Sequence, residues 1–253
     1  MGRVWQAAAT VSSVLDDDLL DRAVACGLRS LFIGFETLSG SNLTLHHKVQ
    51  NHRGDYERAI RRLHDRGVMI NGSFIFGLDH DTPDVFPRTV DWAVDHGIET
   101  ATFHILTPYP GTALFARMAR QGRLRHRDWD RYDTRHAVFT PRRMSPEALE
   151  RGYRRAYRDF YRWRSIARSA NTKPDPGDKL RHLAYTAGWK KFEWFWNAVI
   201  RLNQVHRMVP VLEWVLGRSA RRSEKRAAAR FPGALRTAGY ETEDRAVPRF
   251  DAS

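Results

Sequence analysis

Polar residues that could contact a ligand follow three apolar runs of the chain. Glu36 and Thr37 end the first run, Asp79 comes two residues after Gly77 at the end of the second, and Thr107 begins the loop after the third. A carboxylate can accept hydrogen bonds from two ribose hydroxyls or hold an ammonium group, and a glycine lets a flat ring approach the backbone. In a purely structural alternative, Glu36 and Asp79 cap neighbouring helices, and the residues alone leave both interpretations open.

Other reactive side chains restrict the chemistry. Cys26 is the only cysteine, so the chain cannot form an internal disulfide, a multi-cysteine zinc site or an iron-sulfur cluster on its own thiolates. Cys26 ends an amphipathic stretch, where we expect a buried, inert thiol. Neighbouring side chains point apart, so His46 and His47 do not favour a metal site. His104 lies within an apolar run and is expected to be a hydrogen-bonded core residue or to line a barrel.

The elements that would position these residues alternate between helix and strand. Four amphipathic stretches each end at a glycine, namely Gly27, Gly67, Gly97 and Gly122. Glycine is favoured after a helix C-terminus because it adopts the left-handed backbone conformation readily. Apolar runs at 28–36, 68–78 and 98–107 predict strands of a parallel sheet buried on both faces, and 4–10 is a fourth candidate strand. Thr82 with Pro83, and Asp16 to Asp18, predict helix starts. This β-α order predicts an α/β fold, with ligands at the carboxyl ends of the strands.

The second half of the sequence is more helical and more basic. Ser145 and Pro146 predict a helix start, 171–178 a linker, and Tyr185 belongs to an aromatic stripe on a helix from Leu180. The chain is therefore divided into 1–144, a helical region 145–217 and a basic flexible tail 218–253. The stripe indicates a core, or alternatively a membrane-surface contact. Most of the net charge of +13 lies in this half. A compositional bias toward arginine accounts for this positive charge, and binding to an anionic partner is the alternative. Nucleic acid is not expected as a partner. We expect a cytoplasmic protein without a membrane span or an export signal.

Three stretches resemble a known family. Residues 31–37, 71–82 and 106–112 are similar to successive strand ends of radical SAM enzymes of the cobalamin-binding branch, and the likeness covers 4–168. In that family a six-stranded partial (β/α) barrel binds S-adenosylmethionine (SAM) and a four-iron four-sulfur cluster, and reduction yields a 5′-deoxyadenosyl radical. The resemblance implies that this chain supplies strands three to six.

The same resemblance implies a set of SAM-binding residues. Two would lie near the ribose and methionine, three belong to a GxIxGxxE-like motif behind the adenine, and one approaches the adenine from the last loop: Glu36 and Thr37, then Ser73, Ile75 and Gly77, then Thr107. Ser73 replaces the first glycine of the motif and His80 replaces its glutamate.

The resemblance also shows an absence, because the CxxxCxxC cluster motif is not in this sequence. We expect the C-terminal half of a radical SAM enzyme that is truncated or split and inactive alone. A four-iron cluster and cobalamin would bind only if an N-terminal part is supplied. The substrate is expected to be a small or lipid-like molecule. The alternatives are a non-catalytic nucleotide- or SAM-binding protein, and an interaction subunit that completes a separate cluster-bearing chain.

Overall fold

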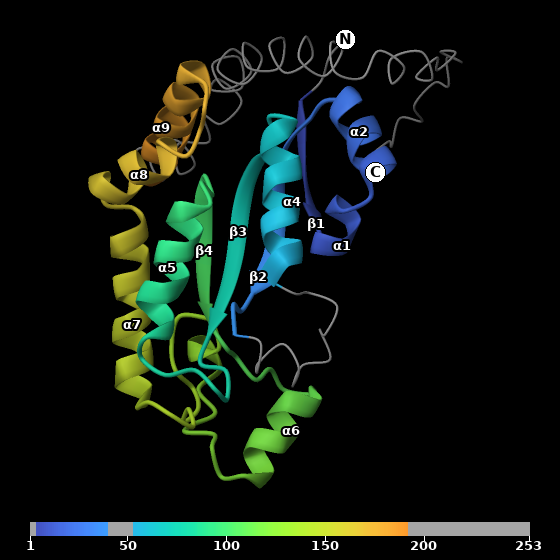
Figure 1. Cartoon of the computed structure of the whole chain (residues 1–253). Helices are drawn as coiled ribbons and strands as arrows, with labels where there is room; N and C mark the ends of the chain where they lie inside the picture. Colours follow the sequence, from blue (N-terminus) through green and yellow to red (C-terminus); the bar gives the residue numbers. More distant parts are fainter. Residues whose placement is uncertain (1–3, 40–52, 192–253) are drawn as a thin grey trace, which may run out of the picture.

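The structure, a computed structural model, describes residues 4–39 and 53–191 and contains one parallel sheet (Figure 1). Its strands follow the order of the sequence: β1 (Trp5–Ala9), β2 (Leu28–Glu36), β3 (Met69–Phe76) and β4 (Thr100–Ile105). Each strand lies within the run predicted for it. The predicted α/β class and the parallel pairing are therefore confirmed.

Helices connect the strands and continue after β4. The helices and one 3-10 turn are α1 (Val11–Val14), α2 (Asp17–Ala25), α4 (Arg53–Asp65), α5 (Val85–Asp95), α6 (Ala113–Arg120), η1 (Trp129–Arg131), α7 (Pro146–Phe160), α8 (Trp163–Ala170) and α9 (Pro176–Lys191). All four predicted C-terminal glycines have positive φ angles, between 64° and 101°. Each helix of residues 4–39 and 53–191 is too short or too polar to cross a membrane.

Side-chain caps explain most of the helix starts. Asp16 accepts a hydrogen bond from the Leu19 amide at the start of α2, and Ser145 does the same for Ala148 in α7. The predicted start of α5 at Thr82 and Pro83 is wrong. The amide of Val85 instead donates to the Thr82 carbonyl in a turn, so α5 begins at Val85.

The second half differs from its prediction in two places. The helix that begins after Ser145 ends at Phe160, and Arg162 then precedes a separate helix, α8, for which no start was predicted. The predicted linker 171–178 ends early, because α9 begins at Pro176. The aromatic stripe beyond Lys191, the tail 218–253, and His46 and His47 lie outside the described residues.

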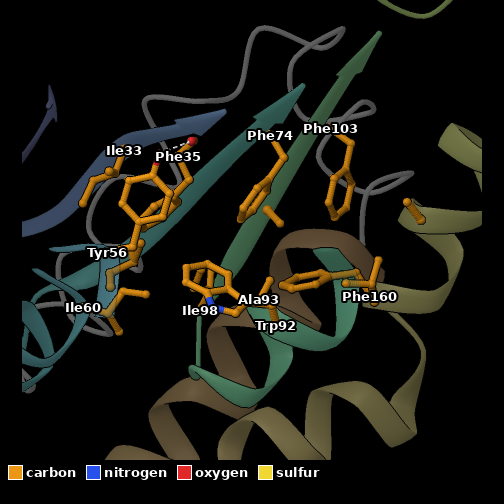
Figure 2. Close-up of a cluster of buried hydrophobic side chains, with 14 of the residues drawn as sticks. Ile33, Phe35, Tyr56, Ile60, Phe74, Trp92, Ala93, Ile98, Phe103 and Phe160 are labelled. Carbon is orange, nitrogen blue, oxygen red and sulfur yellow. Dashed lines mark hydrogen bonds between the residues drawn. The ribbon is translucent and has the colours of Figure 1, made fainter. Parts of the chain in front are cut away.

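One face of the sheet packs against helices and holds the core. Phe74 of β3 stacks between Phe35 of β2 and Phe103 of β4, with ring centroids 5.6 and 5.8 Å apart. Trp92 of α5 meets both Phe35 and Phe74 edge-on, and Tyr56 of α4 donates its hydroxyl to the Phe35 carbonyl (Figure 2). Alternate residues of each strand thus interlock with α4 and α5.

The opposite face, called the open face below, is incompletely covered. On β2, β3 and β4 it carries the residues that alternate with those of the core: Ser30, Phe32, Gly34, Glu36, Asn71, Ser73, Ile75, Thr102 and His104. Phe32 is 39% exposed there, and Gly34 and His104 are half-buried. The prediction of a sheet buried on both faces is therefore wrong. Small and polar side chains dominate this face, so its strands alternate despite their apolar composition.

Two tyrosines, Tyr157 of α7 and Tyr161 directly after it, cover the edge of the sheet at β4. The Tyr161 hydroxyl accepts from the Ala101 amide at 3.1 Å and donates to its carbonyl at 3.0 Å. Tyr157 bonds the Phe103 amide and carbonyl in the same way. The amide of Ile105 donates to a loop carbonyl at 2.7 Å. The edge groups of β4 thus have partners other than a further strand, and residues of the predicted region 145–217 pack directly on the sheet.

Candidate functional site

The carboxyl ends of β2, β3 and β4 meet at one end of the sheet, beside the loop that leads to α6 (Figure 1). A bulge in β2 shapes this end: Gly34 pairs with Ser73, but Glu36 already pairs with Phe74. Glu36 has a φ of 61°, which is uncommon for a residue other than glycine. Among the described residues, a Cβ at Gly34 would meet only atoms of Glu36, the nearest being Oε1 at 3.6 Å. The Glu36 carboxylate therefore borders the space that the missing side chain of Gly34 leaves on the open face, called the hollow at Gly34 below.

Polar oxygens without partners lie on the same face. Ser73, 8% exposed, is paired with Gly34 on one side and Thr102 on the other. Thr102 Oγ1 and Asn71 Oδ1 are buried and have no hydrogen-bond partner among the described residues. Buried polar atoms in native proteins have partners as a rule, so these two oxygens indicate a polar ligand or water on the open face. Sequence reasoning missed Asn71 and Thr102, which alternation with Ser73 would have identified.

Three other predicted residues shape the surrounding loops. The Thr37 hydroxyl accepts from the Ser39 amide at 3.1 Å, and the Thr107 hydroxyl donates to the Ile105 carbonyl at 3.0 Å. Gly77 has a φ of 94°, and its missing Cβ would lie 2.8 Å from Leu149 of α7. These contacts explain the residue types structurally. Binding of SAM by the six predicted residues stays a prediction.

Asp79 is an ion-pair residue and does not cap a helix. Its carboxylate lies 2.9 Å from Arg123 and 3.3 Å from Arg142. Burial alone would raise the pKa of Asp79, but the hydrogen bond and charge of Arg123, helped by Arg142, lower it overall. The carboxylate that organises this loop is Asp81, which is 3% exposed and accepts from the Gly77 amide at 2.9 Å. The sequence-based prediction singled out Asp79, because the three-dimensional partners that distinguish Asp79 from Asp81 cannot be recognised in the sequence.

The donor set decides which cofactors the described residues fit. The hollow at Gly34, the Glu36 carboxylate and the unpaired oxygens of Asn71 and Thr102 fit a polar organic ligand such as SAM. They do not fit a four-iron cluster, because Cys26 is the only thiol and caps α2 at the far end of β2. Contrary to the prediction of a buried thiol, Cys26 is exposed, since it follows the last helical turn at the surface. No group of metal-ligating side chains is present among residues 4–39 and 53–191.

Comparisons with known proteins agree with the strand-end motifs. Residues 112–222 match a family described as a domain of unknown function, DUF4070. The chain is 33% identical over 174 residues to bacteriochlorophyllide d C-12(1)-methyltransferase of Chlorobaculum tepidum, covering 69% of this chain and 38% of that protein. It is 27% identical over 153 residues to the anaerobic magnesium-protoporphyrin IX monomethyl ester cyclase of Rubrivivax gelatinosus, covering 60% and 26%. The chain thus spans less than half the length of these relatives.

A solved structure shares less with the chain. This structure is the radical SAM methyltransferase TsrM of Kitasatospora setae, solved with cobalamin and a [4Fe-4S] cluster. The two sequences are 19% identical, the match covers 68% of this chain and 36% of TsrM, and the TM-score is 0.43. On its sequence homologues, the chain belongs to the radical SAM superfamily, in the cobalamin-binding branch of methyltransferases and cyclases.

Proposed function

We propose that this chain supplies the SAM-binding strand ends of a radical SAM methyltransferase or cyclase. In this proposal β1 to β4 correspond to strands three to six of a six-stranded partial barrel, and the open face is the inside of that barrel. The observation that carries the proposal is the hollow at Gly34, bordered by Glu36 and by buried oxygens that need partners. Ligands of α/β barrels and open α/β sheets bind at this end of the strands.

The residues of this face would each make a distinct contact. Glu36 would accept hydrogen bonds from the ammonium group or the ribose hydroxyls of SAM, and Ser73 and Thr102 would bond its polar edge. Ile75, half-buried beside Ser73, would pack on the adenine. Bound SAM would supply a methyl group or, with a reduced cluster, the 5′-deoxyadenosyl radical. The chain's own part is to bind SAM, orient it and keep water from one side.

The cluster would be held by thiolates outside these 253 residues, because Cys26 alone cannot replace three. The proposed partner is therefore a polypeptide segment that carries the cysteine motif. The single cysteine also favours a second candidate function, a protein that binds SAM or a nucleotide without redox chemistry. In both cases the open face is the binding site.

Calorimetric titration with SAM tests the site itself. Gly34→Val would fill the hollow without touching the core, since a Cβ there contacts only Glu36. We expect this variant to bind SAM at least about tenfold more weakly, a loss of about 1.4 kcal/mol, with an unchanged melting temperature. Gly54→Val is the matched control, because a Cβ at Gly54 meets nothing within 4 Å and lies on α4. Equal SAM affinity in Gly34→Val and wild type would contradict the proposal.

A second experiment separates the two candidate functions. The chain would be co-expressed with the cysteine-bearing N-terminal part of a homologous methyltransferase, and the purified material reduced anaerobically with SAM. Formation of a complex that releases 5′-deoxyadenosine supports the enzyme. If the chain binds SAM alone but forms no complex and releases no 5′-deoxyadenosine, the binding protein is supported instead.

A further inference from the structure

His104 is the last residue of β4 whose side chain lies on the open face. It pairs with Ile75 of β3 and follows Thr102 on the same face of its own strand. Its side chain is half-buried. His104 therefore stands beside the proposed SAM site, at the mouth of the proposed barrel.

A loop residue holds the His104 ring. Thr134 Oγ1 lies 3.2 Å from His104 Nδ1, and the Thr134 carbonyl accepts from the Ile105 amide at 2.7 Å. Thr134 has a φ of 65°, a left-handed conformation that is costly for a β-branched residue. Such strained residues cluster at functional sites, where the surrounding structure fixes them. Thr134 is thus anchored to β4 twice, in the conformation that brings its hydroxyl to the histidine.

The second ring nitrogen of His104 is Nε2. Nε2 makes no hydrogen bond with a described residue. Burial lowers the pKa of His104. In the tautomer whose Nδ1 donates to the Thr134 hydroxyl, Nε2 carries the lone pair. Metal-binding histidines have this arrangement, in which one nitrogen is fixed by a hydrogen bond and the other donates its lone pair.

We propose that His104 Nε2 binds the substrate as an axial ligand to the magnesium of a tetrapyrrole, with Thr134 as its positioning residue. This inference rests on the proposed function and places the substrate beside SAM on the open face. The two named relatives act on tetrapyrroles, one of them a magnesium complex by name. A ring metal held in a plane by four nitrogens leaves axial positions, and a neutral imidazole fills one without adding charge. The bond forms by donation of the Nε2 lone pair in place of a solvent ligand.

The test compares magnesium-protoporphyrin IX with metal-free protoporphyrin IX, titrated into the full chain and followed by absorbance. We expect wild type to prefer the magnesium complex about tenfold or more. His104→Gln should abolish that preference, whereas His96→Gln, at the far end of α5, should keep it. Thr134→Val, which lacks the hydroxyl, should reduce the preference for magnesium-protoporphyrin IX. Thr134→Ser, which keeps the hydroxyl, should retain that preference. Free imidazole should restore a five-coordinate spectrum to His104→Gly, which keeps the test valid should His104→Gln fold poorly.

Two results would overturn the inference: wild type binding both porphyrins equally, or His104→Gln keeping the preference for magnesium. SAM titrations on the same samples keep the proposed function separate. Magnesium preference that depends on His104 in a protein without SAM affinity would reject the SAM site alone. Normal SAM binding without magnesium preference would reject the role of His104 alone.

Discussion

Lys173 Nζ lies 2.6 Å from Glu99 Oε1, and both side chains are almost fully buried. The other Glu99 oxygen accepts from the Ile70 amide at 2.9 Å and lies 3.4 Å from His64 Nε2. Burial alone would raise the pKa of Glu99, but the charges of Lys173 and His64 bring it well below its ordinary value. This network joins α4, the starts of β3 and β4, and the segment after α8. The network lies at the amino ends of β3 and β4, opposite the carboxyl ends where the proposed SAM site lies.

Removing the charge of Glu99 should therefore destabilise the fold. Glu99→Gln leaves Lys173 buried without its counterion, and loss of one partner of a buried pair costs about 3 to 5 kcal/mol of unfolding free energy. Chemical denaturation measures this difference. Asp18→Asn, which breaks an exposed pair with Arg22, is the control and should change little. Equal effects of the two substitutions would show that the buried network does not stabilise the sheet.

The same network predicts a pH dependence. Burial lowers the pKa of His64 below its ordinary value. The unfolded chain therefore binds a proton there at a higher pH than the folded chain, and stability falls as the pH drops below about 6.5. The pKa of Glu99 is also lowered, and its contribution is lost only in more acid solution, below about pH 4.3. Melting temperatures between pH 8 and 5 should decline in wild type and in the control His136→Gln, at a side chain 44% exposed, and decline less in His64→Gln.

The hydrogen bonds between Tyr161 and the edge strand β4 give a third prediction. Tyr161→Phe removes a hydroxyl that serves both the amide and the carbonyl of Ala101, so unfolding free energy should fall by about 1 to 3 kcal/mol. Tyr109→Phe, at a side chain 47% exposed, is the control. Hydrogen exchange should quicken at the Ala101 amide in the first variant only. Unchanged exchange there would mean that the tyrosine does not protect the edge.

The order of elements could be predicted from sequence because local rules determine it. Gly27 and Gly67 follow helix ends in a left-handed conformation, and Ser145 caps α7. These helix boundaries can therefore be predicted from the local sequence without the tertiary structure. The open face was missed because small residues such as Gly34 and Ser73 read as part of an apolar run.

Contacts between residues far apart in the sequence could not be predicted either. Glu99, His64 and Lys173 are far apart in sequence, and only folding shows that they share one buried network. Candidate site residues came from resemblance, which indicates strand ends but not which hydroxyls already have partners. Thr107 illustrates this, since its hydroxyl bonds the Ile105 carbonyl.

A pair of carboxylate substitutions separates ligand binding from structure. Glu36→Gln should weaken SAM binding by about 1.5 to 3 kcal/mol, the range for hydrogen bonds to a charged group, and leave the melting temperature nearly unchanged. Asp81→Asn should do the reverse, because Asp81 holds the Gly77 and Leu78 amides. Titration calorimetry and thermal melts on both variants measure these effects. Lost stability with unchanged SAM affinity in Glu36→Gln would remove Glu36 from the site.

The central claim, that SAM binds the open face at the carboxyl ends of the strands, is tested most directly by mapping SAM-induced amide shifts in the NMR spectrum of the labelled full chain. We predict that the largest shifts fall at Gly34, Glu36, Ser73 and Thr102, with the amide of Leu63 on α4 unmoved. Shifts gathered on the helical face, or no shifts at millimolar SAM, would contradict the account.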